Sequence, residues 1–168
     1  FRTMTQSALL TFLPVYLARD MGYSPLVVGA CLFAVQAAGF AAAPVAGHLS
    51  DRMGRKQILV ASMLSSAVVL VFMALAGGSP VFIALIAILG FFLYATRPVI
   101  QAWLLDVTPK NMGGSSIGVL FGAQAVGGAL GPYFGGMIAD RYGLLATFYF
   151  LAFTIVIANV LVIWVPKK

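Results

Sequence analysis

An arginine stands inside a long apolar stretch of this sequence. Arg97 follows PVFIALIAILGFFLYAT, and the next acidic residue, Asp106, comes about 13 Å further along if the segment is a helix rising 1.5 Å per residue. A helix also places Gly90, Tyr94, Arg97 and Gln101 on one face, because they are spaced three or four residues apart. An ionisable side chain at such depth is a functional candidate. We expect Arg97 to hold an anionic group in a polar cavity; the alternative is that it reaches toward a membrane surface or pairs structurally.

Amide side chains within other apolar segments are further candidates for such a cavity: Gln36, Gln124 and Asn159. Each of them could contact a substrate or make a hydrogen bond between helices. Acidic residues are missing from the middle of every segment, since Glu is absent and the four aspartates lie at segment ends: Asp20, Asp51, Asp106 and Asp140. Proton coupling usually needs a titratable group within the membrane. If the protein is proton-driven, we expect that group to lie outside this sequence.

The composition points to a membrane protein. The 168 residues are 62% hydrophobic and 8% charged, with a mean hydropathy of +1.04, whereas a soluble domain carries about 25% charged residues. The net charge of +6 fits positive loops at a membrane surface better than nucleic-acid binding, because no basic patch alternates with aromatic residues. Cys31 and His48 each occur alone, so we expect neither a disulfide, a metal site nor a cofactor. No nucleophile–base pair is evident, so we do not expect an enzyme.

The chain divides into apolar segments of about the length that crosses a bilayer, roughly 20 residues. They cover residues 3–18, 25–48, 57–76, 80–105, 114–138 and 144–165, and each break between them contains glycine, proline or charge. We therefore expect an all-α, polytopic protein of six transmembrane helices in one bundle. The chain begins at Phe1, its first segment is short, and no signal-peptide cleavage pattern is present, so we expect it to be part of a longer protein.

Six crossings place both ends of the chain on one side of the membrane. One set of loops then holds seven cations: Arg2, Arg52, Arg55, Lys56, Lys110, Lys167 and Lys168. The other set holds Arg19 and Arg141, each beside an aspartate. The positive-inside rule then predicts that both termini are cytoplasmic.

An internal repeat divides the six segments into two groups of three. PVAGHLSDRMG (44–54) ends the second segment and YFGGMIADRYG (133–143) ends the fifth; the two share glycine, Asp-Arg and a final glycine in register. The repeat predicts units of about residues 1–78 and 79–168. Because each unit has an odd number of spans, the second is inverted in the membrane. Inverted repeats of this kind recur in secondary transporters, with substrate sites near the middle of the bilayer.

The stretch GHLSDRMGRK after the second segment resembles the signature loop of the major facilitator superfamily, and with the 3+3 repeat the resemblance covers the whole chain. It implies one six-span half of a two-half carrier, whose partner half lies outside this sequence. TMTQSALLTFLP (3–14) and PKNMGG (109–114) resemble the C-terminal half of fosmidomycin-resistance-type efflux carriers. We favour the C-terminal half, with the N-terminal half as the alternative.

The resemblance implies that the signature loop is a cytoplasmic gating latch between the halves, formed by Gly47, Asp51, Arg52, Gly54, Arg55 and Lys56. Asp51 would lie near a helix N-terminus of the other half, where a carboxylate is stabilised. The three cations would pair with acids or lipid phosphates. The alternative is a positively charged anchor that has no part in gating.

The fifth segment is rich in glycine at helical spacing. Gly114, Gly118 and Gly122 are four residues apart, as are Gly127, Gly131 and Gly135, so each set leaves a groove where another helix can approach closely. Part of the segment resembles the glycine–proline motif of drug–proton antiporters: Gly118, Gly127, Gly131, Pro132, Gly135 and Gly136. We expect a helix-packing face suited to sliding or static contact, with a bend at Pro132.

Together these features predict a secondary active transporter that works by alternating access, most simply exporting a small, anionic molecule against proton entry. Its partners would be the lipid bilayer of the plasma or inner membrane, the substrate, protons and the other half of the carrier. Two alternatives are uptake by symport and a non-transporting membrane sensor or scaffold. A channel is not favoured, because no filter-like polar helix is evident.

Overall fold

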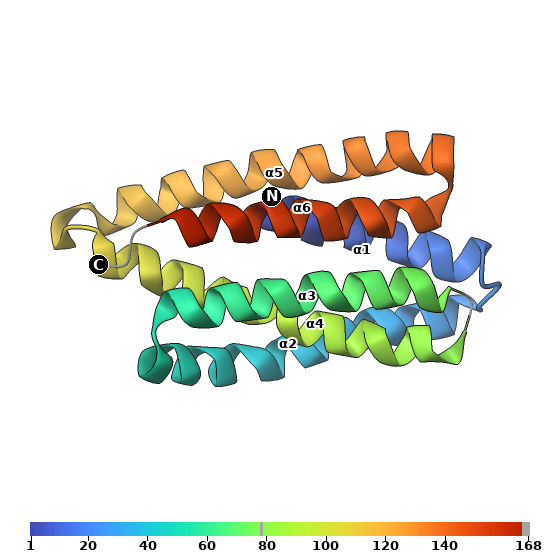
Figure 1. The fold of residues 1–168 in the computed structure, drawn as a ribbon, viewed down its shortest axis with the longest axis horizontal. Coiled ribbons are helices and arrows are strands. Elements are labelled where there is room, and N and C mark those ends of the chain that lie inside the picture. The colour runs from blue at the N-terminus through green and yellow to red at the C-terminus, as the bar shows by residue number, and fades with distance from the viewer. Residues whose placement is uncertain (78, 166–168) are drawn as a thin grey trace.

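The computed structural model describes residues 1–77 and 79–165 and consists of six long helices joined by short connections (Figure 1). Gly78 and residues 166–168, which include Lys167 and Lys168, lie outside the described residues. The helices are α1 (Arg2–Arg19), α2 (Pro25–Met53), α3 (Arg55–Ala76), α4 (Pro80–Val107), α5 (Gly113–Tyr142) and α6 (Leu144–Trp164), with a short 3-10 turn, η1 (Lys110–Met112), before α5. The expected all-α architecture of six segments is confirmed.

The connections after α2 and α5 are shorter than the sequence predicts. We expected GHLSDRMGRK to form a loop, but α2 continues to Met53 and α3 begins at Arg55, so Gly54 alone separates them. Gly54 has φ +99° and ψ 136°, and Gly143, its counterpart in the repeat, has φ +84° and ψ 164°. Both backbone N–H groups bond to the carbonyl four residues back, Ser50 and Ala139 respectively. Because a positive φ suits glycine, each motif turns the chain within a single residue.

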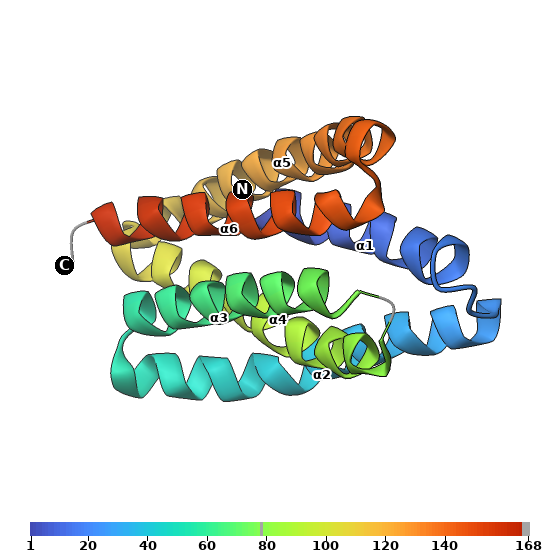
Figure 2. The ribbon, with the colours of Figure 1, turned by 45° about the vertical axis from the view of Figure 1, so that its right-hand side comes forward.

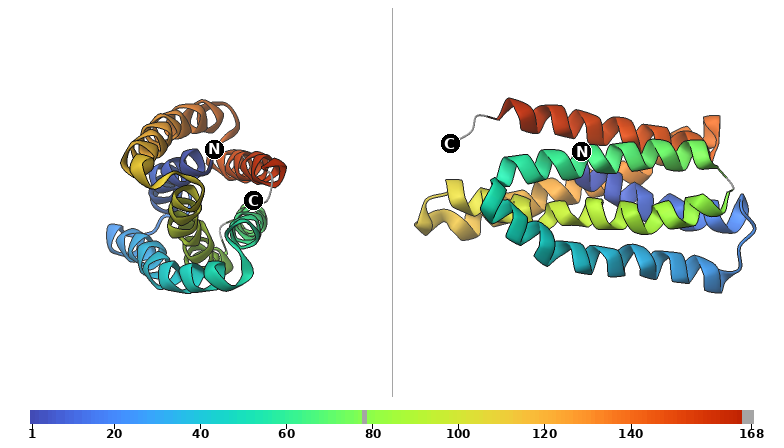
Figure 3. Two further views of the ribbon diagram at one scale, coloured as in Figure 1. Left: turned by 90° about the vertical axis from the view of Figure 1, so that its left-hand side faces the viewer. Right: turned by 60° about the horizontal axis from the view of Figure 1, so that its bottom comes forward.

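The helices run alternately along a common direction and form two groups (Figures 1 and 2). The end-on view in the left panel of Figure 3 shows α1 and α4 in the middle, with α5 and α6 on one side and α2 and α3 on the other. The turns at Gly54 and η1 lie at one end of the bundle, which we call the signature end (Figure 1). The connections at residues 20–24 and 143 lie at the opposite end, as do the end of α3 and the start of α4.

Two glycines bring helices into close backbone contact. A Cβ on Gly90 of α4 would lie 2.5 Å from the carbonyl oxygen of Val35 in α2, and one on Gly131 of α5 would lie 2.3 Å from that of Met4 in α1. No side chain fits at either place. The pairs α2–α4 and α1–α5 therefore pack at the distance that glycine alone permits.

Contacts between other helices include an aromatic cluster and a pair of hydroxyl groups. Tyr16, Phe82 and Phe148 from α1, α4 and α6 form one aromatic cluster, with ring centroids 5.0 to 5.7 Å apart. Thr5 of α1 and Thr154 of α6 lie 2.8 Å apart through their hydroxyl oxygens. Such hydrogen bonds hold transmembrane helices together where water is absent.

The first residues of the chain lie part-way along the bundle, away from the signature end, as the N marks in Figures 1 and 2 show. Arg2 is only 6% exposed and donates a hydrogen bond to Thr96, in the middle third of α4. The assignment of Arg2 to a positively charged loop is therefore wrong. The error arises because a charge count by position treats the first residues of a chain as a loop, whereas the lateral packing of α1 against α5 and α6 sets their depth.

Five of the described helices are long and apolar enough to cross a membrane, namely α2 to α6. The first helix is not among them, because Arg2, Arg19 and several Thr, Ser and Gln residues lower its hydropathy. Its buried face nevertheless packs against α5, α6 and α2, with Leu9, Leu13 and Leu17 fully buried.

Candidate functional site

A cavity of about 420 Å³ with several polar residues in its wall lies between α1, α4 and α5. Its polar lining comes from all three helices: Thr3, Gln6, Ser7, Arg97, Gln101 and Gln124. Leu10, Phe121, Ala125 and Gly128 complete the wall. The structure thus brings together three of the residues that the sequence singled out, Arg97, Gln101 and Gln124.

Small residues on α5 leave the space for this cavity. At Gly131, α1 packs closely against α5. Almost one turn away, a Cβ on Gly128 would have more room, since its nearest neighbours would be Thr3 at 3.8 Å and Ser7 at 3.9 Å. Larger side chains on this face of α5 would fill the volume that the polar side chains of α1 now border. The glycine pattern therefore sets both the closeness of the two helices and the room beside them.

Arg97 is the exposed cation of the cavity. Its guanidinium carbon lies 5.5 Å from the centre of the Tyr94 ring, within the range of a cation–π contact. Among the described residues, the ion pairs join Arg55 to Asp51 and Asp106, and none involves Arg97. Because the four aspartates all lie near helix ends, nothing in the described chain neutralises Arg97.

A second arginine lies just behind the same cavity. Arg2 donates from Nη1 to Gln6 Oε1 at 3.2 Å and to Thr96 Oγ1 at 3.3 Å, and from Nη2 to Thr3 Oγ1 at 3.3 Å. All three partners are neutral. Sequence reasoning missed this group, although Thr3, Gln6 and Ser7 recur at the three- and four-residue spacing that puts polar side chains on one helix face.

Other expected cavity residues lie elsewhere. Gly90 and Tyr94 face α2, since Gly90 packs on Val35 and a Cβ on Gly39 would meet the Tyr94 ring at 2.7 Å. The predicted stripe on α4 is thus divided: α2 covers its first part, and the cavity borders Arg97 and Gln101. Helix periodicity alone cannot show where a neighbouring helix leaves a face uncovered.

Gln36 and Asn159 also lie outside the cavity lining. Gln36 is exposed on α2. Asn159 is buried in α6 and donates from Nδ2 to the carbonyl oxygen of Val60 in α3 at 3.3 Å, while its Oδ1 has no hydrogen-bond partner among the described residues. Asn159 thus has the interhelical hydrogen bond that was the alternative to substrate contact.

The glycine face of α5 divides in the same manner. Gly131 and Gly135 contact α1 most closely, since a Cβ on Gly135 would lie 2.6 Å from the Phe12 ring, and Gly127 and Gly136 are within 4 Å of α1. Nothing lies within 4 Å of a Cβ on Gly114, Gly118 or Gly122, so the first glycine groove is unoccupied by the described chain. Pro132 lies inside α5, which continues as a helix to Tyr142.

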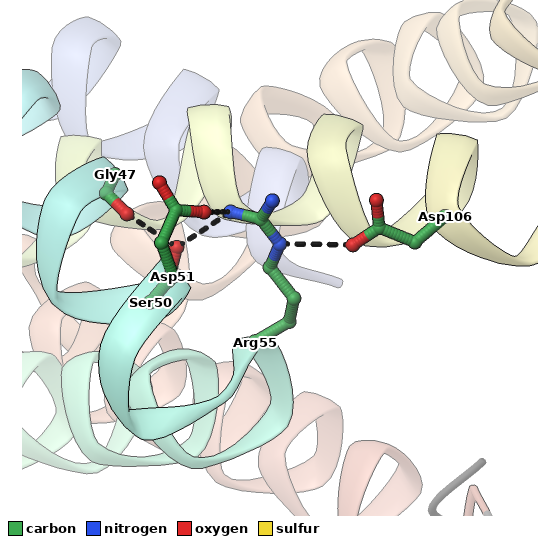
Figure 4. Close-up of polar contacts among 5 residues, drawn as sticks. All are labelled: Gly47, Ser50, Asp51, Arg55 and Asp106. Carbon is green, nitrogen blue, oxygen red and sulfur yellow. Dashed lines mark hydrogen bonds and ion pairs between the residues drawn. The ribbon is translucent and has the colours of Figure 1, made fainter.

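The signature motif forms a charged cluster at the end of the bundle (Figure 4). Arg55 at the start of α3 lies between two carboxylates: its Nη1 is 2.5 Å from Asp51 Oδ1 and its Nε is 3.0 Å from Asp106 Oδ2. The same Nη1 donates to Ser50 Oγ at 2.9 Å, and that hydroxyl donates to the Gly47 carbonyl at 2.8 Å. One guanidinium therefore joins the ends of α2, α3 and α4.

Lys56 extends this cluster to a fourth helix. Its Nζ donates to the carbonyl oxygen of Ile163 at 2.7 Å and to that of Val165, at the C-terminal end of α6. Lys56 was expected to pair with an acid or a lipid phosphate, and its partners among the described residues are these backbone carbonyls. Unpaired carbonyls at a helix C-terminus carry partial negative charge and attract a cation in the same way.

A membrane-type helical bundle with a polar cavity among its helices defines the class: an all-α, polytopic membrane protein. The family follows from comparison with known sequences, in which the family model of the Major Facilitator Superfamily matches residues 1–168. The chain belongs to this superfamily.

Among curated relatives, the chain is similar to multidrug resistance proteins named MdtG. It is 35% identical to the one from Serratia proteamaculans over 127 residues, which is 76% of this chain and 31% of that protein. It is 34% identical to the one from Escherichia coli O1:K1 / APEC over 158 residues, which is 90% of this chain and 38% of that protein. The chain therefore spans less than two fifths of the length of these relatives.

Proposed function

We propose that the protein containing this chain is a secondary transporter that exports a small anionic molecule, and that the cavity between α1, α4 and α5 is this chain's share of the substrate site. The observation that carries the proposal is Arg97, a cation in the cavity with no carboxylate partner among the described residues. Membership of the superfamily supports transport, and the names of the multidrug resistance relatives support export.

The chemistry proposed for the cavity is charge compensation. A guanidinium is stabilised when an anion accepts its hydrogen bonds, and its planar fork suits two-pronged binding of a carboxylate or phosphate. Gln101 and Gln124 would supply neutral hydrogen bonds to the polar remainder of the substrate. The glycine contact between α1 and α5 would let the helices that border the cavity stay in contact during movement.

Alternating access requires a second body against which this bundle can rock. We propose that the remainder of the protein supplies it as another six-span half, and that the two repeat units of this chain, residues 1–78 and 79–168, are related as an inverted pair. The matching single-glycine turns at Gly54 and Gly143 support the repeat. A proton-binding group would also come from the remainder, because the aspartates of this chain lie near helix ends.

The bundle would lie in the inner membrane with the signature end in the cytoplasm. Arg52, Arg55, Lys56 and Lys110 gather toward that end, against Arg19 and Arg141 at the other, and this imbalance supports the orientation by the positive-inside rule.

Replacing Arg97 tests the proposal in the full-length protein. We expect expression in a strain without its own exporters to protect it from growth inhibitors that are anions and not from cationic ones. Arg97→Gln should abolish most of this protection, whereas Arg97→Lys should keep part of it, because lysine retains the charge without the two-pronged geometry. Arg19→Gln, a change at the opposite end of the bundle, is the matched control. Membrane insertion should be normal in all three variants.

Two results would contradict the proposal. One is full protection against anionic inhibitors by a well-inserted Arg97→Gln protein, and the other is protection against cationic inhibitors alone. Arg97 would have a structural role if the Arg97→Gln protein fails to insert while the Arg97→Lys protein inserts normally and gives full protection.

A further inference from the structure

Arg2 is buried, carries no counter-charge among the described residues, and contacts two of the side chains that line the cavity. A buried arginine with only neutral partners is costly, because its desolvation is not offset by an opposite charge. Its position behind the cavity wall therefore calls for a functional explanation.

The hydrogen bonds of Arg2 fix which atoms of its neighbours remain available. Arginine can only donate, so the atom of Gln6 that faces it must be the acceptor oxygen Oε1. Oε1 is then engaged by Arg2, and the amide Nε2, which can only donate, is the polar group of Gln6 that makes no bond to Arg2. Thr3 follows the same rule: its Oγ1 accepts from Arg2, and its hydroxyl proton is left for another partner.

Arg2 is itself held in one orientation by α4. Thr96 uses its hydroxyl proton on the carbonyl oxygen of Leu93, at 2.7 Å, and therefore offers only a lone pair to Arg2. Thr96 is fully buried, so this arrangement does not depend on solvent. The donor and acceptor are therefore determined for each hydrogen bond in this series: Thr96 donates to the backbone of α4, and Arg2 donates to Thr96 and to the cavity residues Gln6 and Thr3.

We propose that Arg2 is a positioning residue that turns the α1 wall of the cavity into a surface of hydrogen-bond donors, so that the site selects anions. Gln6 and Thr3, which could otherwise donate or accept, present donors beside the guanidinium of Arg97. A wall composed of hydrogen-bond donors and cations binds an anion. It offers no partner to a cation or to a ligand whose polar groups are hydrogen-bond donors. The inference rests on the proposed function and adds the means of selectivity.

The variant Gln6→Glu tests whether the hydrogen-bond donors of the α1 wall, and not only its packing, determine anion binding. The new carboxylate has the same shape and forms an ion pair with Arg2, so the bundle should fold, but it removes the donors of Gln6 and adds a negative charge to the wall. Gln57→Glu makes the same chemical change on the exposed surface of α3 and is the control. Arg2→Met removes the guanidinium directly, and Arg2→Lys tests whether a point charge suffices.

The measurement is the unfolding temperature of the full-length carrier in detergent, titrated with benzoate, phenyl phosphate and, as a cation, tetraphenylphosphonium. We expect both anions to stabilise the wild-type protein and the cation not to. Gln6→Glu should keep its unliganded unfolding temperature and weaken the binding of both anions about tenfold or more, the size of one lost hydrogen bond to a charge. Gln57→Glu should bind as the wild type does.

The outcomes distinguish this inference from the function on which it rests. If Gln6→Glu and Arg2→Met bind the anions normally while Arg97→Gln does not, the role of Arg2 is overturned and the anion site stands. If neither anion stabilises the wild-type protein, or if Arg97→Gln binds them normally, the anion site fails and the role of Arg2 fails with it. Partial rescue by Arg2→Lys where Arg2→Met loses binding supports the inference even if Gln6→Glu does not fold.

Discussion

Arg55 concentrates the polar contacts of the signature end in one side chain. It pairs with Asp51, four residues before it, and with Asp106, on a helix that is far away in the sequence. The carboxylates are half exposed, with side-chain exposures of 60% and 54%, against 24% for Arg55. Ion pairs of this exposure contribute about 0–1 kcal/mol each to stability. We therefore propose that the cluster matters more for the choice between conformations than for folding.

This leads to a prediction for Asp51→Asn in the full-length carrier. Asparagine keeps the shape of the side chain but loses the charge that faces Arg55, so the balance between conformations should shift while the cavity remains intact. We expect turnover to fall several-fold and substrate affinity to stay within about twofold, with a change in unfolding free energy below about 1 kcal/mol. Transport rates and ligand titration of the same preparation measure the two effects.

Asp20→Asn is the control, because Asp20 is an exposed carboxylate at the opposite end of the bundle. Unchanged turnover in Asp51→Asn would leave the signature motif as a structural and topological feature without a part in gating. An equal loss in both variants would indicate a general effect of charge.

At the scale of elements, the contact between α1 and α5 depends on the absence of side chains. A methyl group at Gly131 would lie 2.3 Å from the backbone oxygen of Met4, so either helix must move to admit it. The cavity lies directly beside this contact and is bordered by residues on both helices. Gly131 therefore affects both the stability of the contact between α1 and α5 and the shape of the cavity beside it.

We predict that Gly131→Ala destabilises the bundle, by about 1–3 kcal/mol if it behaves as overpacking does in soluble cores. Gly122→Ala, on the same helix, meets nothing within 4 Å and should be neutral or slightly stabilising, because alanine favours helix more than glycine does. Thermal unfolding in detergent compares the two. Equal unfolding temperatures would mean that α1 and α5 separate at little cost, and the tight contact would lose its proposed importance.

At the scale of the whole molecule, the cavity is bordered on three sides by α1, α4 and α5, and its arginine is exposed in this chain. The large apolar side chains exposed on α5, such as Val119, Phe121 and Val126, are suited to contact with lipid or with another helical body. The chain matches less than two fifths of its curated relatives. These features favour a site completed by another part of the protein.

We therefore predict that residues 1–168 alone, inserted in liposomes, do not transport. The expected result is no saturable, gradient-driven flux of the anion that the full-length carrier exports, and recovery of flux when the remainder of the protein is produced with it as a separate chain. Saturable flux through the fragment in its monomeric form would contradict the prediction. A fragment that transports only as a dimer would show that a second copy can replace the remainder.

The sequence determined the helices, and the tertiary structure decided which side chains meet. Apolar length, glycine at Gly54 and Gly143, and proline at helix starts are local signals, so the six segments and their order could be predicted within a few residues. The contact of Arg2 with Thr96 joins residues 94 apart and depends on how closely glycine lets α1 approach its neighbours. Helix periodicity fixes a face but not the depth or the partner of that face, which is why Arg97 could be selected from the sequence and Arg2 could not.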